Sequence, residues 1–320
     1  MPKTCKRLTI LAFGEINLDI ILRGYRSFPA PGREVLIEDF LVTLGSSSAI
    51  TGAGLSMLGN AVAYLGRAGD DYAGRLCLDR MTELGLDVSL VKLYPHLKTG
   101  VTVSLACRQD RSLMSYLGAT TALTSANFGD GIFGPFRHAH SSSYFLQTGL
   151  HPGFAEVFAK AKRRGLTTSL DPACDPAGEW KSGIEEVLRY IDVFLPNEVE
   201  LEGITGKKDP LAALRSLENG TTLTVAKLGS HGAMALENGE PICVSAPEIE
   251  PVDPTGAGDC FNAGFLHAWL RGKPLKDALR LGVACGSFST RALGGTGAQP
   301  TEEQAEAFLK SFAHGGANQS

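Results

Sequence analysis

Between about residues 140 and 227 the chain alternates short apolar runs with amphipathic segments of helical spacing, joined by short connectors. Such alternation is typical of a mostly parallel β-sheet whose connecting helices cover both faces. Ligands of such sheets bind beyond the carboxyl ends of the strands, so functional side chains are expected there. The expected elements, in order, are a strand at 144–147, a helix at 153–164, a strand at 166–170, a helix at 182–190, a strand at 193–195, helices at 198–205 and 210–218, and a strand at 223–227.

The N-terminal part of the chain is less regular. Two stretches, about 15–44 and 97–118, hold alternating apolar residues and turn signals that do not fit the α/β rhythm. Across this part, the spacing of apolar residues predicts strands at 8–13, 20–22 and 101–106 and helices at 49–66 and 73–85.

Composition argues against several classes of protein. Hydrophobic residues make up 43% of the 320 and charged residues 20%, which is ordinary for a globular protein. A net charge of −4 gives no indication of a nucleic-acid partner, and no apolar run has the length of a membrane span. The seven cysteines are scattered without a Cys-x-x-Cys pair, which favours reduced thiols and a cytoplasmic location.

The strongest functional signal lies in residues 253–264, which read DPTGAGDCFNAG. The small residues 256–258 let backbone N–H groups approach a ligand, and the helix predicted to begin here aims its positive end at the same place. Together these features favour a phosphate site. A phosphate repels a carboxylate, so Asp259 is better explained as the base that accepts a proton from an attacking hydroxyl group. The alternative is an ordinary helix start in which Asp259 only stabilises the first turn.

With this stretch, and over nearly its whole length, the chain resembles the PfkB (ribokinase-like) family of carbohydrate kinases. The resemblance implies an α/β fold, a ribokinase-like three-layer sandwich with a mostly parallel central sheet and helices on both faces. It also implies a small β-sheet lid made from the stretches 15–44 and 97–118, through which two copies can form a homodimer. Residues 1–313 would form the kinase domain, and the Gly-rich tail 314–320 is predicted to be disordered.

The reaction implied by the resemblance is an ATP-dependent transfer of the γ-phosphoryl group to a hydroxyl, expected to be primary, of a small sugar or sugar derivative. The catalytic residues carried over from the family signature are Asp259, Gly256, Ala257 and Gly258. Backbone N–H groups of the last three would stabilise the charge on the phosphoryl group in transfer.

The nucleotide side rests on two further motifs. Asn197 and Glu200 match the family's Asn-x-x-Glu motif, in which Glu200 would orient Mg²⁺ through water and Asn197 would support the triphosphate. The structural alternative is an N-capped helix with a glutamate in its first turn. The segment 227–232 resembles the family's nucleotide-side loop. The resemblance thus implies a nucleotide site made of Asn197, Lys227, Gly229, Gly232, Gly256 and Gly258.

The acceptor side is implied by Asp19, since a carboxylate can receive two neighbouring hydroxyl groups of a sugar. The family pattern adds Asn17, Gly45, Ser46 and Asp259 to this site. The chain departs from the pattern where Ser46 replaces a glycine and Ile50 replaces a sugar-binding asparagine, and no carboxylate lies near Gln147. These differences argue against ribose itself. The family can also hold a monovalent cation such as K⁺, here expected near Asp253, Thr255, Gly297 and Thr301.

Two other functions stay open at this point. A nucleoside kinase of the same family would need an apolar or aromatic lid against the nucleobase, for which Phe13, Phe28, Phe40 and Tyr116 are candidates. A non-catalytic sugar- or nucleotide-binding relative is the second alternative, although the intact Asp259 and the preceding small residues argue against it. A metal pair at His138 and His140 lacks a third ligand nearby in the sequence.

Overall fold

The computed structural model describes residues 9–313 apart from 26, 29, 107–110, 130 and 181–182. Its main sheet has nine strands in the order β13-β12-β11-β10-β9-β8-β1-β4-β5. Neighbouring strands pair in parallel, except that β12 pairs antiparallel with both β11 and β13. The strands are β1 (Thr9–Gly14), β4 (Ala61–Gly69), β5 (Lys92–Tyr94), β8 (His138–Ser141), β9 (Thr167–Leu170), β10 (Val193–Phe194), β11 (Leu223–Lys227), β12 (Ala233–Glu237) and β13 (Glu240–Val244).

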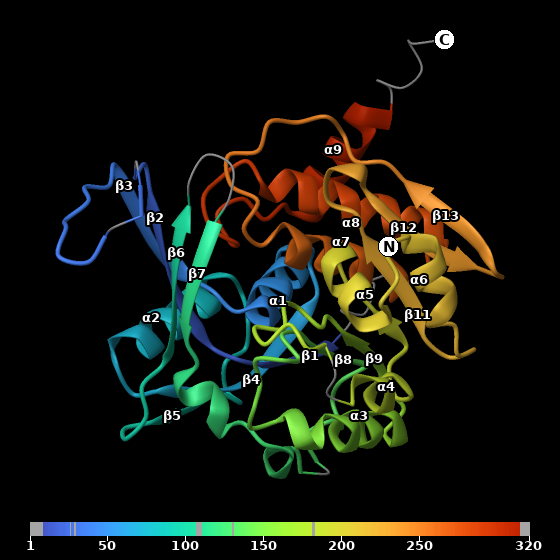
Figure 1. Ribbon diagram of the computed structural model, residues 1–320. Helices are drawn as coiled ribbons and strands as arrows, with labels where there is room; N and C mark the ends of the chain where they lie inside the picture. The colour runs from blue at the N-terminus through green and yellow to red at the C-terminus, as the bar shows by residue number, and fades with distance from the viewer. Residues whose placement is uncertain are drawn as a thin grey trace, which may run out of the picture.

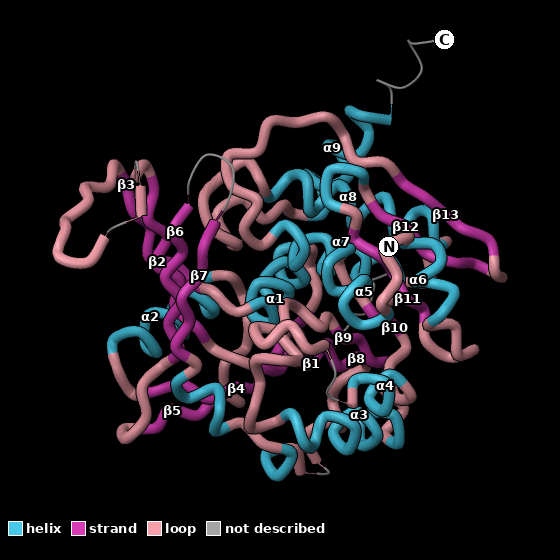
Figure 2. The backbone as a smooth tube through the Cα atoms, in the orientation of Figure 1, coloured by secondary structure: helices cyan, strands magenta, loops and turns pink. Residues whose placement is uncertain are grey.

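Helices cover both faces of this sheet, which confirms the expected three-layer α/β fold (Figure 1; Figure 2). The first face packs against α1 (Ser47–Met57), α2 (Tyr72–Glu83), α7 (Ala257–Trp269) and α8 (Leu275–Ser289), with α9 (Glu302–Ala313) against α8. The opposite face packs against α3 (Phe154–Arg163), α4 (Ile184–Leu188), α5 (Glu198–Thr205) and α6 (Pro210–Ser216).

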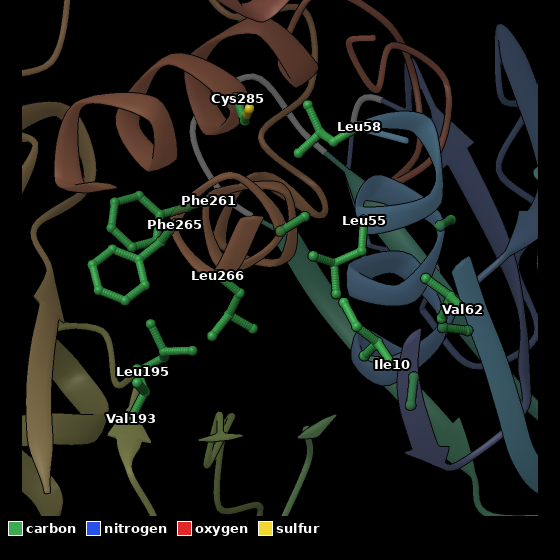
Figure 3. Close-up of a cluster of buried hydrophobic side chains, with 14 of the residues drawn as sticks. Ile10, Leu55, Leu58, Val62, Val193, Leu195, Phe261, Phe265, Leu266 and Cys285 are labelled. Atoms are coloured by element: carbon green, nitrogen blue, oxygen red, sulfur yellow. The ribbon is translucent and has the colours of Figure 1, made fainter. Parts of the chain in front are cut away.

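The alternation of side chains along β1 divides the core in two. Ile10 and Ala12 are buried in the cluster on the α7 side, whereas Leu11 and Phe13 are buried in the cluster on the α3 side. On α7, Phe261 and Phe265 stack at 6.1 Å. Figure 3 shows both rings on the side of α7 that faces the strands of the sheet. The helix that follows Asp259 is therefore fixed by its apolar side.

A second, smaller sheet stands apart from the main sheet (Figure 1). Its strand order is β3-β2-β6-β7, and all four strands lie within the two irregular stretches of the sequence. The central pair, β2 with β6, is parallel, and the outer pairs are antiparallel. We call this sheet the lid. It comprises β2 (Asn17–Arg23), β3 (Asp39–Leu44), β6 (Gly100–Ala106) and β7 (Arg111–Tyr116).

Two elements differ from the sequence prediction. The strand expected at 144–147 is wrong, because residues 144–146 form a turn after Ser143, whose φ is 57°, and the strand is β8 at His138–Ser141. The helix expected at 49–66 ends at Met57. Gly59 then has a φ of 86°, which breaks the helix, and residues 61–69 form β4.

The division of the chain into one domain at 1–313 and a tail stays a prediction, and the tail 314–320 lies outside the described residues. In the part of the chain that the structure describes, no helix has the length and apolarity needed to cross a membrane.

The contact between α7 and α8 depends on a glycine. A methyl group at Gly264 would lie 2.6 Å from the Leu281 carbonyl oxygen and 2.7 Å from Cys285 Sγ. We expect Gly264→Ala to lower the free energy of unfolding by about 1–3 kcal/mol through overpacking, despite the better helix propensity of alanine. Urea denaturation measures this, with Gly129→Ala as control, since a methyl group there meets nothing within 4 Å. Equal stability of the two variants would contradict the close packing.

Candidate active site

Polar residues gather where the parallel strands of the main sheet end. Glu15 directly follows β1, Asp171 follows β9, and Lys227 is the last residue of β11. Asn197 follows β10 and forms an isolated parallel bridge with Lys227. Since the strands are parallel, these residues share one edge of the sheet, and α7 begins with Asp259 in its first turn nearby.

The N-terminus of α7 has the geometry of an anion site. Gly256 precedes the helix with a φ of 75°, and a methyl group there would lie 2.4 Å from Gly295 Cα. No side chain caps the helix. The N–H of Ala257, expected from the sequence to serve a phosphoryl group, instead donates to the Pro254 carbonyl oxygen (3.1 Å). Helix geometry leaves the N–H groups of Gly258 and Asp259 without an acceptor inside the helix.

A buried cation lies beside this helix start. Lys227 Nζ donates to Asp171 Oδ2 at 2.5 Å, and a methyl group added at Gly258 would lie 3.5 Å from the same nitrogen. Asn262, one turn after Asp259, donates its Nδ2 to the same Asp171 oxygen at 2.5 Å. Burial by itself would lower the pKa of Lys227, but Asp171, Glu200 and Asp259 together raise it. The ammonium group therefore stays charged.

Asp259 is 9% exposed and has an unusually high proton affinity. Burial is the first cause that raises its pKa well above the ordinary value, and the charge of Asp171 is the second. Glu15 adds to the effect, while Lys227 and a hydrogen bond from Ser47 oppose it. Such a carboxylate accepts a proton more readily than an exposed aspartate does.

Asn197 and Glu200 form a capping box at the start of α5. Asn197 donates its backbone N–H to Glu200 Oε2 at 2.8 Å and its Nδ2 to Oε1 at 2.6 Å, and Glu200 N–H donates to Asn197 Oδ1 at 2.9 Å. Burial, and after it the charge of Asp171, raise the pKa of Glu200 to about 7, against the effect of Lys227. The N-capped helix expected as the structural alternative is thus present. It holds the Glu200 carboxylate at the edge of the sheet that carries Lys227.

The base of the lid brings the expected acceptor residues together. Asn17 Nδ2 donates to Asp19 Oδ1 at 2.7 Å and to Thr102 Oγ1 at 3.1 Å. A methyl group at Gly45 would lie 2.1 Å from Asp19 Oδ1, so only glycine fits against this carboxylate. Ser46 follows Gly45 and caps α1. The first residue of α1, Ser47, hydrogen-bonds the Asp259 carboxyl group. The start of α1 therefore connects the lid to the base of α7.

The two departures from the family pattern have structural explanations. Ser46 adopts a φ of 71°, which is strained for a side chain, but its Oγ donates to the Glu15 carbonyl oxygen (2.7 Å) and accepts from Ala49 N–H (3.2 Å). Ile50 is 3% exposed and packs against Gly295, where an added methyl group would lie 2.5 Å from its Cδ1. Hydrocarbon thus fills the place where an asparagine is usual.

The remaining predicted residues lie in turns around the same region. Asp253 Oδ1 accepts from Thr255 N–H (2.9 Å) and Oδ2 accepts from Gly294 N–H (2.8 Å), which joins the turn before α7 to the segment that contains Gly297. Thr301 accepts from Gln304 N–H at the start of α9. A K⁺ site here stays a prediction. Gly229 and Gly232 form the turn after β11, with φ values of 54° and 99°.

Asp171, Asn262 and Glu15 were not among the predicted site residues. Asp171 and Glu15 directly follow strands, and Asn262 lies one turn after Asp259, so their positions in the sequence indicated a place at the site. The hydrogen bonds of Asp171 could not be predicted in this way, because they join residues 56 and 91 positions apart. Asn262 Oδ1 is buried without a hydrogen-bond partner in the described structure.

The two histidines that were considered and rejected as metal ligands form hydrogen bonds inside the sheet. His138 and His140 both hydrogen-bond Ser169 Oγ at 2.7 Å. Burial lowers the pKa of both, that of His140 to about 4, so both rings are neutral. Among the described residues, no group of three or more His, Cys, Asp or Glu side chains is placed to hold a metal ion.

Comparisons with known proteins identify the family and support the fold. A family model described as pfkB family carbohydrate kinase matches residues 7–302. The chain is 26% identical over 312 residues to a ribokinase of Haemophilus influenzae, which covers 95% of this chain and 99% of the relative. A ribokinase from Thermotoga maritima has a similar structure, with a TM-score of 0.80, 25% identity, and coverage of 95% of this chain and 99% of the other.

An Arabidopsis thaliana ribokinase, solved with ribose and ATP, has a TM-score of 0.80 and 24% identity, and covers 95% of this chain and 99% of its own. The family model spans most of the chain. The chain therefore belongs to the pfkB family of carbohydrate kinases, phosphotransferases that act on an alcohol group.

Proposed function

We propose that the protein transfers the γ-phosphoryl group of ATP to a hydroxyl group, primary by preference, of a small uncharged sugar or sugar derivative, with Asp259 as general base. The observation that supports this most is the buried Asp259 carboxylate, raised in proton affinity, in the first turn of an uncapped helix. A carboxylate with these properties is suited to take a proton beside a phosphate site.

The positions of these groups support the following reaction. The acceptor oxygen attacks the γ-phosphorus while its proton passes to an Asp259 oxygen, and the bond to the ADP oxygen breaks. The N–H groups of Gly258 and Asp259 and the Lys227 ammonium stabilise the negative charge on the phosphoryl group in transfer. Mg²⁺, when bound, neutralises charge on the triphosphate, and Glu200 would orient it through water from the α5 side.

The proposed acceptor site is the base of the lid. Asp19 would accept hydrogen bonds from two neighbouring hydroxyl groups, with Asn17 beside it and Gly45 giving it room. The acidic groups at this side include the carboxyls of Asp19, Glu15 and Asp259, while the Lys227 ammonium is paired with Asp171. This distribution supports an acceptor without negative charge rather than a phosphosugar or a sugar acid.

Three of the four aromatic residues considered for a nucleoside lid, Phe13, Phe40 and Tyr116, do not face the proposed acceptor site. Phe13 is fully buried in the core, with its ring 4.9 Å from that of Phe128, so this part of the sequence interpretation is wrong. Asp19 pairs with Thr43, whereas Phe40 pairs with Leu22, so strand alternation places Phe40 on the opposite face of the lid. Tyr116 lies on that same far face, since it pairs with Val101, the partner of Leu18. These positions favour a sugar over a nucleoside.

Two further expectations go with this function. We propose that K⁺ binds between the turn at Asp253 and the segment that contains Gly297 and Thr301, because the Asp253 carboxylate already joins those two parts of the chain. The cytoplasmic location also stays a prediction. It rests on the scatter of the cysteines, of which those described are free.

The general base can be tested by Asp259→Asn. The amide cannot take the proton, so we expect kcat to fall at least about 100-fold while KM for ATP changes little. An assay of ADP release with Mg·ATP, against a panel of ketoses, aldoses and sugar alcohols, measures this. Asp277→Asn on the exposed side of α8 is the matched control. An Asp259→Asn variant with near wild-type kcat would contradict the role of Asp259 as general base.

The acceptor site can be tested by Gly45→Ala. The added methyl group would displace the Asp19 carboxylate, and loss of a hydrogen bond to a charged group costs about 1.5–3 kcal/mol. We expect KM for the acceptor to rise on the order of 10-fold or more, with KM for ATP nearly unchanged. Steady-state kinetics with each substrate varied in turn separates the two effects. Unchanged acceptor KM in this variant, with Gly129→Ala as control, would place the acceptor elsewhere.

The far face of the lid supports the expected homodimer. Phe40 is 63% exposed and Met114 is 60% exposed on this face, and both lie over strands whose neighbouring residues, Ile20 and Val103, are also apolar. An exposed apolar patch of this kind favours contact with a second copy. We propose that two lids pack face to face.

Charge on this face should separate the copies. We expect the wild-type chain to be a dimer by light scattering after size exclusion, and the double variant Phe40→Glu/Met114→Glu to be a monomer. Val199→Glu on α5, at a side chain that is 68% exposed, should remain a dimer. A wild-type chain that is monomeric at tens of micromolar would refute the lid interface.

A further inference from the structure

Both carboxylate oxygens and the backbone N–H of Asp171 form hydrogen bonds with residues from different parts of the fold. Its Oδ1 accepts from Ala173 N–H at 3.0 Å, and its Oδ2 accepts from Lys227 Nζ and Asn262 Nδ2, each at 2.5 Å. Its own N–H donates to the Ser141 carbonyl oxygen at 3.0 Å. A carboxylate bound in this way cannot rotate, so it fixes whatever it holds.

The group that it holds is an ammonium beside the proposed phosphate site. Lys227 leaves the end of β11, and its Nζ lies beside Gly258 in the first turn of α7. A lysine side chain is flexible and loses its charge readily when it is buried without a partner. The position and the charge of Lys227 therefore both depend on Asp171, with Asn262 holding the same oxygen from the α7 side.

We propose that Asp171 is a positioning residue of the phosphoryl-transfer site: with Asn262 it holds the Lys227 ammonium beside the first turn of α7 and acts on the reaction through Lys227. The proposal rests on the function proposed above. It assigns Asp171 no contact with substrate, and it makes Lys227 a fixed cation that is in place before the nucleotide binds.

A double-mutant cycle between Asp171→Asn and Lys227→Met tests this. In each single variant we expect kcat with Mg·ATP and the best acceptor of a ketose and aldose panel to fall about 10–100-fold, with the acceptor KM within about threefold. If Asp171 acts through Lys227, the double variant has about the kcat of Lys227→Met alone. A double variant that loses the product of the two single losses would overturn the proposal, as would wild-type kcat in Asp171→Asn.

Thermal stability gives a second readout that needs no acceptor. Each single variant leaves one buried charge unpaired, so both should melt at a lower temperature than the double variant, which has neither charge. A double variant that melts below both single variants would contradict the coupling. If the wild-type chain phosphorylated no sugar while this coupling was found, the proposed function would fail and the ion pair would stand as a structural device only.

The control is a second carboxylate of the same loop. Asp175 accepts hydrogen bonds from the N–H groups of Ala177, Glu179 and Trp180, and in the part of the chain that the structure describes no hydrogen bond or ion pair joins it to Lys227. Asp175→Asn therefore perturbs the loop without perturbing the cation. We expect its kcat to stay within about threefold of wild type. An equal loss in Asp175→Asn and Asp171→Asn would show that loop order, and not the position of Lys227, is what matters.

Discussion

The buried ion pair between Asp171 and Lys227 is the interaction on which the rest of the site depends. Two charges taken out of water are stable only when their remaining hydrogen-bonding groups are also satisfied. Here the Asp171 carboxylate meets that requirement with Asn262 and the Ala173 N–H. Because the partners come from β9, β11 and α7, the pair fastens the helix that carries Asp259 to the edge of the sheet.

The same pair influences the protonation of its neighbours. Burial first, and the charge of Asp171 second, raise the pKa of both Asp259 and Glu200, while the ammonium of Lys227 opposes the rise. Without the cation, several carboxylates in one buried region would repel each other and take up protons. With it, the region keeps one positive group among them, close to the place where a phosphate would bind.

Local patterns in the sequence predicted much of this structure. The start of α7 was predicted correctly because the small residues and Asp259 lie together in the chain, and so was the capping motif of Asn197 and Glu200. β8 was missed because His138 and His140 are polar residues, and the hydrogen bonds that satisfy their buried rings include those to Ser169 in another strand. Apolar periodicity cannot detect such a strand.

The contacts of Asp171 were beyond prediction for a related reason. Its partners lie 56 and 91 residues away, and no spacing rule connects them. Ser46 was noted as a departure from the family pattern, but the hydrogen bonds that make its backbone conformation tolerable appear only when Glu15 and Ala49 are placed in space. The sequence could show that the position was unusual and not why it is allowed.

The order of strands in the main sheet has a consequence for synthesis on the ribosome. β1, the first strand to emerge, lies between β4 and β8. Glu15 at its end belongs to a site that also needs Lys227 on β11 and the start of α7. A nascent chain that ends before Ala257 already contains the lid and every strand of the main sheet, yet it has neither the helix start nor Asp259. If Asp259 acts as proposed, the growing chain can transfer a phosphoryl group only after the strands of both sheets have been made.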